Sequence, residues 1–144
     1  MNYIQEAIDR LEEYDQLYTA VDNIKEELFA LKAESDMLGA QKITDMPRGG
    51  NWEPDDKLCN NIAKRKELTQ RLAISQRRIQ QVENVLEKLD DDEKKLIEIL
   101  YIKGGKKAMD RAMEEFNYEK TKMYVMKNSV TRKVAKMILG LGVA

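Results

Sequence analysis

Two long stretches of the chain carry apolar residues at steps of three and four, and this spacing constrains the fold more than any other feature. The first stripe consists of Ile4, Ile8, Leu11, Tyr14, Tyr18, Val21, Ile24, Leu28, Leu31 and Leu38. Such spacing collects the apolar side chains on one face of an α-helix and leaves the charged residues on the others. A helix over residues 3–38 would be about 54 Å long, too long to lie across a small globule. We therefore predict one long, partly exposed helix.

A second helix of similar length should follow an irregular linker. The linker, residues 39–56, holds both prolines and three of the seven glycines. Pro54 suits a first helical turn, where Asp55 and Asp56 would face the positive end of the helix dipole. The second stripe is Leu58, Ile62, Arg65, Leu68, Leu72, Ser75, Ile79, Val82, Leu86 and Leu89. The simplest arrangement for residues 1–89 is an antiparallel coiled-coil hairpin, formed within one chain or between two.

The composition excludes several classes of function. The chain contains no histidine and one cysteine, Cys59, so it lacks an internal disulfide and the usual zinc ligands. It shows no glycine-rich phosphate loop and no paired nucleophile and base, so we expect no enzyme activity, no cofactor and no metal. No apolar run is long enough to span a membrane, and we expect a cytoplasmic protein. Trp52 would either cover the end of the hairpin or anchor a partner.

The charge changes sign along the chain. Residues 1–90 hold 13 basic and 18 acidic side chains, whereas residues 91–144 hold 12 basic and 8 acidic ones. Residues 103–136 alone carry 10 basic and 4 acidic side chains. A basic segment of this kind is typical of a protein surface that binds nucleic acid. It would also occur in a solvated helical bundle whose positive charge balances the negative charge of the hairpin.

Three short helices are predicted in the basic part, residues 90–144. The first would begin at Asp90 and end at Gly104 and Gly105, the second would cover residues 106–116, and the third would follow a turn at Asn117. A tight turn between the last two helices makes a helix-turn-helix, whose final helix enters the DNA major groove. The predicted DNA-binding residues are Lys106, Lys107, Tyr118, Lys120, Thr121, Lys122, Lys127 and Arg132, with Val125 as a further base contact.

The same segment resembles the region 4 helix-turn-helix of bacterial sigma factors. The resemblance rests on "LDDDEKKLIEILYI", "KKAMDRAMEEFN" and "YEKTKMYVMKNSVTRKVAKMIL". With a coiled coil ahead of this module, the whole chain is similar to phage-encoded late transcription regulators of the ArpU and RinA type. Asn117 replaces the turn glycine of sigma modules, and lysine, tyrosine and methionine replace the arginines of their groove helix. No part of the chain looks like the sigma module that binds the promoter −10 element.

The resemblance implies a transcription regulator that binds double-stranded DNA, with the coiled coil serving homodimerisation or contact with host RNA polymerase. The alternative is a coiled-coil assembly or adaptor protein of a phage, including a packaging subunit like a small terminase.

Overall fold

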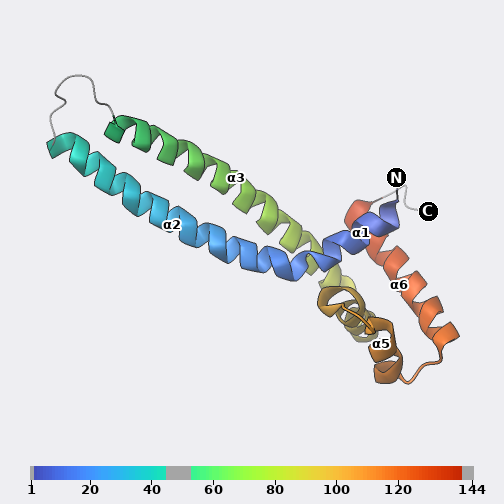
Figure 1. The fold of residues 1–144 in the computed structure, drawn as a ribbon. Coiled ribbons are helices and arrows are strands. Elements are labelled where there is room, and N and C mark those ends of the chain that lie inside the picture. Colours follow the sequence, from blue (N-terminus) through green and yellow to red (C-terminus); the bar gives the residue numbers. More distant parts are fainter. Residues whose placement is uncertain (1, 45–52, 141–144) are drawn as a thin grey trace. The chain divides into compact units, whose positions relative to one another are not determined.

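Helices make up all the regular structure of the part of the chain that the computed structural model describes, residues 2–44 and 53–140 (Figure 1). The elements are α1 (Tyr3–Glu12), α2 (Tyr14–Thr44), α3 (Glu53–Lys88), α4 (Asp91–Ile97), the π-helix η1 (Glu98–Lys103), α5 (Ala108–Phe116) and α6 (Lys120–Leu139). The prediction of an all-α protein is confirmed. Trp52, and with it either role predicted for that side chain, lies outside the described residues.

The first predicted helix is interrupted at one residue and extends further than expected. Glu13 separates α1 from α2, although its backbone N–H still donates to the carbonyl of Asp9 at 3.0 Å. The helix does not end at Gly39, because α2 continues to Thr44. A single glycine costs a helix only about 1 kcal/mol, which its neighbours can offset.

The chain forms two compact units. One contains residues 1–18 and 77–144, which we call the head, and the other contains residues 19–76, which we call the hairpin. The boundary expected between residues 89 and 90 falls inside the head. Both long helices therefore contribute residues to each unit.

Within the hairpin, α2 and α3 run antiparallel and side by side (Figure 1). Val21, Leu31 and Leu38 are buried as the stripe predicts. On α3, however, Ile62 is 51% exposed, and its neighbour Asn61, only 3% exposed, occupies the interface in its place. The prediction for Ile62 was therefore wrong.

A polar cluster explains why asparagine is accepted at the buried position. The Asn61 amide donates to the carbonyl of Leu31 at 2.7 Å and accepts from Arg65 Nε at 2.8 Å, while the Arg65 guanidinium also donates to Ser35 at 3.2 Å. Burial of a polar side chain costs little when its hydrogen bonds are made. Arg65, which interrupts the apolar stripe in the sequence, is thus part of the interface.

The head has a continuous core to which α1 contributes. The core consists of Leu11, Val82, Val85, Leu86, Leu89, Leu96, Ile97, Tyr101, Ala112, Met123, Val130 and Val134. On the other side of α1, Ala7 packs against Ala135 of α6, and both are fully buried. The prediction that the whole of residues 3–38 belongs to the hairpin was wrong, because α1 covers a face of α6 that would otherwise be in water.

Local hydrogen bonds define the helices of the head. Asp90 and Glu93 form a reciprocal capping box at the start of α4, with distances of 2.8 and 3.2 Å. Lys133 of α6 donates to the same Glu93 carboxylate at 2.9 Å, so one side chain both caps α4 and holds it to α6. Gly104 ends η1 with a φ of +55°.

Candidate nucleic-acid interface

The turn between α5 and α6 lies at Asn117, as the sequence predicts. Asn117 adopts a φ of +56°, a conformation that asparagine tolerates better than most residues. The N–H of Tyr118 donates to the carbonyl of Met113 at 3.1 Å, which closes the end of α5. The chain then enters α6 after only two further residues.

Tyr118 is partly buried in this turn. Its ring stacks on that of Phe116, with 5.6 Å between the ring centroids, and the Lys122 ammonium lies 4.1 Å from its centroid. The ring therefore fixes the turn and positions Lys122, and it does not project freely from the surface.

The inner face of α6 is buried in the head. Met123, Val130 and Val134 are at most 4% exposed. Thr131 is also buried, and its hydroxyl lies 2.9 Å from the hydroxyl of Tyr101. These contacts leave one side of the helix to solvent.

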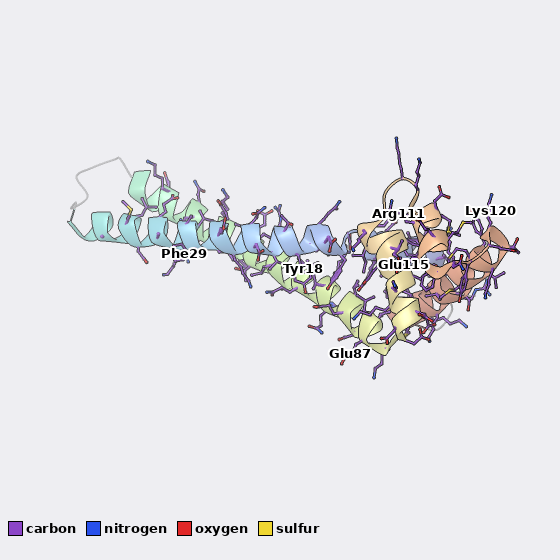
Figure 2. All side chains as sticks on the ribbon, turned by 90° about the horizontal axis from the view of Figure 1, so that it is seen from below. Tyr18, Phe29, Glu87, Arg111, Glu115 and Lys120 are labelled. Carbon is purple, nitrogen blue, oxygen red and sulfur yellow. The ribbon has the colours of Figure 1, made fainter. Side chains whose placement is uncertain are left out.

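The outer face of α6 carries the exposed side chains Thr121, Lys122, Val125, Asn128, Ser129, Arg132 and Lys136. No residue of α6 is acidic, whereas six are basic: Lys120, Lys122, Lys127, Arg132, Lys133 and Lys136. Short polar, apolar and arginine side chains in one row are the types that contact base edges in DNA. Lys120 projects from the first turn of the helix (Figure 2).

Arg111 holds the loop that carries Lys106 and Lys107. Its guanidinium donates to the carbonyl of Lys106 at 2.9 Å and also to that of Gly104. Lys107 is left-handed, with a φ of +63°, and immediately precedes α5. Both lysines are exposed.

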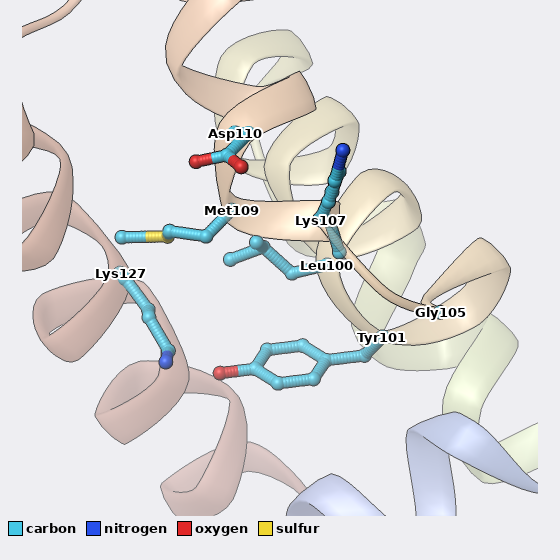
Figure 3. Close-up of a pocket in the computed structure, with 8 residues that line it drawn as sticks. Leu100, Tyr101, Gly105, Lys107, Met109, Asp110 and Lys127 are labelled. Carbon is cyan, nitrogen blue, oxygen red and sulfur yellow. The ribbon is translucent and has the colours of Figure 1, made fainter.

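Lys127 does not lie on the outer face. At about 100° per residue, it points about 140° away from Lys122 and from Arg132 around the helix. Its partly buried side chain lines a cavity of about 300 Å³ together with Lys107 (Figure 3). Leu100, Tyr101, Gly105, Ala108, Met109 and Asp110 complete the lining.

One acidic residue near the interface is neutralised by an ion pair. Glu115 of α5 pairs with Lys95 of α4. The hydrogen bond and the attraction to Lys95 lower the pKa of Glu115, and the same contact raises the pKa of Lys95. Glu119, which precedes α6, makes no side-chain hydrogen bond to the helix end and is exposed.

The structure does not bring the predicted site residues onto one surface. Lys122 and Arg132 lie on the outer face with Thr121, whereas Lys107 and Lys127 share the cavity. At about 100° per residue, Lys120 in the first turn of α6 points about 160° away from Lys122, toward the side of Lys127. Lys106 lies in the loop before α5, and Tyr118 belongs to the turn.

Four residues of the interface were not among the predicted DNA-binding residues: Asn128, Ser129, Lys136 and Arg111. Ser129 follows Val125 by four residues and precedes Arg132 by three, so helical spacing alone could have placed it on the outer face. Arg111 gave no such signal, because its acceptors are backbone carbonyls of a loop.

Comparison with protein-family models, with curated proteins and with solved structures finds no match to this chain. No helix in the described part of the chain is long and apolar enough to cross a membrane. Residues 2–44 and 53–140 contain no group of three or more Cys, Asp or Glu residues placed to hold a metal ion.

Proposed function

We propose that this chain is a DNA-binding transcription regulator of phage or prophage origin, in which α5 and α6 form a helix-turn-helix. One observation carries the proposal: α6 exposes a row of base-reading residue types and contains no acidic residue. A helix that merely covered a solvated bundle would have no reason to exclude carboxylates from 20 consecutive positions.

The outer face would enter the major groove. Thr121, Asn128 and Arg132 supply donors and acceptors for base edges, and Val125, which is exposed, can contact a thymine methyl group. Lys106 and Lys120 would contact phosphates on either side, which positions the helix without reading sequence. Lysine lacks the bidentate fork of arginine, so Arg132 should contribute most to base preference.

The hairpin would serve homodimerisation or contact with host RNA polymerase. A dimer would double the number of groove helices and require two half-sites in the DNA. This role is the one that the similarity to phage late regulators implies.

Fluorescence anisotropy with duplex DNA from the region upstream of the gene tests the proposal. If about five phosphates are neutralised, log affinity should fall against log salt concentration with a slope of about −4.5. Lys120→Glu should greatly weaken binding and leave the helical circular dichroism unchanged. The matched control is Lys88→Glu, on an exposed position of α3, which should have no effect. No binding at low salt, or a slope near zero, would refute the proposal.

An assembly or adaptor protein is the second candidate, and one feature of the hairpin favours it. Phe29, labelled in Figure 2, is 79% exposed, and Met37 is 70% exposed. Helical spacing puts the two about 80° apart, on one side of α2. Exposed apolar side chains grouped on one face often mark a protein contact. A stable heteromer in light scattering that is lost in a Phe29→Gln, Met37→Gln double variant, together with no DNA retardation, would favour this function.

A further inference from the structure

Lys107, in the turn before α5, and Lys127 of α6 line one cavity, apart from the outer face of α6 (Figure 3). We propose that this cavity seats a single phosphodiester group of the DNA backbone. The inference rests on the proposed function, since it names the part of the DNA that this surface takes.

The charge of the cavity matches a phosphodiester. Lys107 and Lys127 supply two positive charges, and Asp110, which also lines the cavity, supplies one negative charge. The net charge of about +1 equals that needed to neutralise one backbone phosphate. A free phosphate or a phosphate monoester carries about −1.5 to −2 at neutral pH, and Asp110 would repel it more strongly.

The cavity wall also contains hydrogen-bond donors with no partner in the helix. The first residues of α5, Ala108, Met109 and Asp110, line the cavity, and Lys107 makes no side-chain cap there. Backbone N–H groups of a first helical turn have no acceptor within the helix and suit an anion. Figure 3 shows the Lys107 and Lys127 side chains pointing in opposite directions, so at least one of them has to turn to hold the same phosphate as these donors.

The position of Lys127 is consistent with this role. Its side chain is partly buried, with the ammonium 5.5 Å from the centre of the Tyr124 ring. The nearby Tyr101 hydroxyl is already bonded to Thr131, so it keeps the wall in place. Lys127 thus acts with α5, and not with the base-reading row on its own helix.

The proposal separates two kinds of DNA contact. Lys107 and Lys127 should provide affinity for every sequence, because a phosphate contact carries no base information. The outer-face residues should provide the preference for one sequence over another.

The test uses the full chain and two duplexes, the upstream sequence and a scrambled version. Lys107→Gln and Lys127→Gln should each reduce affinity about tenfold on both duplexes and make the salt slope shallower by about one. Lys103→Gln, at an exposed position in the last turn of η1, is the matched control and should change neither. Circular dichroism checks that each variant folds.

Neutral methylphosphonate linkages, placed at one backbone position at a time, then locate the contact. At one position per half-site the linkage should weaken binding of the unchanged chain but not of the Lys107→Gln, Lys127→Gln double variant. If every linkage weakens both proteins equally, the cavity does not bind a backbone phosphate. The same conclusion follows if the double variant keeps the original salt slope. In both cases the proposed DNA binding itself is not refuted. If the unchanged chain binds neither duplex, both the proposed function and the phosphate site in the cavity are refuted.

Inorganic phosphate provides the last arm of the test. The amide NMR signal of Met109 should not titrate with phosphate at millimolar concentration. A saturable shift that is lost in the double variant would assign the cavity to free anions and overturn the proposal.

Discussion

Replacing Leu11 by alanine should loosen α6, which lies at the opposite end of the sequence. Leu11 is 0% exposed and packs in the same core as Val130 and Val134 of α6. The substitution removes about three carbon atoms from the core, which costs about 2.4 kcal/mol of transfer free energy, and the cavity left behind adds to this. We therefore expect the free energy of unfolding of the head to fall by about 3 kcal/mol.

Native-state hydrogen exchange measures this loss where it occurs. A change of about 3 kcal/mol is a factor of about 100 in the opening equilibrium, so amides of α6 that exchange by opening of the head should exchange about 100 times faster. Leu28→Ala is the matched control, because Leu28 belongs to the hairpin and is only half-buried. Unchanged exchange in α6 with faster exchange in α2 would refute the packing of α1 in the head.

Three further outcomes are expected. Asn61→Leu should lower the free energy of unfolding by about 1 to 3 kcal/mol, because the carbonyl of Leu31 loses its buried donor. The control Asn60→Leu, at an exposed position, should change the free energy of unfolding little. Urea denaturation measures both variants. Burial raises the pKa of Tyr101 above the value of about 10 expected in the unfolded chain, so its stabilising contribution should be complete below pH 10 and be lost as the pH rises further. Tyr101→Phe should make that alkaline decline shallower in denaturation curves recorded at several pH values, and an unchanged decline would show that other groups cause it. Asn117→Gly should be close to neutral and Asn117→Val destabilising by about 1 kcal/mol or more in thermal denaturation, because the residue is left-handed.

Most of the helices could be predicted from local sequence signals. The capping box of Asp90 and Glu93 and the left-handed Asn117 each depend on residues a few positions away. The same is true of the start of α3, at Glu53, one residue before the predicted Pro54. Such features are visible in the sequence because the interacting groups are near neighbours in the chain.

Which face of each helix is buried was harder to predict from the sequence. Periodicity assigned Ile62 to the hairpin interface, yet Asn61 occupies it through a hydrogen bond to another helix. Periodicity also grouped Lys127 with the exposed residues of α6, although it lines a cavity whose other walls come from η1 and α5. In both cases the sequence showed that a face exists but not which element would cover it.

The sequence by itself determined that the described part of the chain is helical, and it determined the start of α3, the turn at Asn117 and a basic carboxyl-terminal third, because hydrogen bonds within a helix and the charge of side chains are properties of short segments. Only the tertiary structure decided that α1 joins the head against α6, that α6 has a cavity side and an outer side, and that Lys127 of α6 lines the same cavity as Lys107. These outcomes depend on which apolar surfaces find each other across the whole chain, and the free energy of that burial is shared among residues that no local pattern connects.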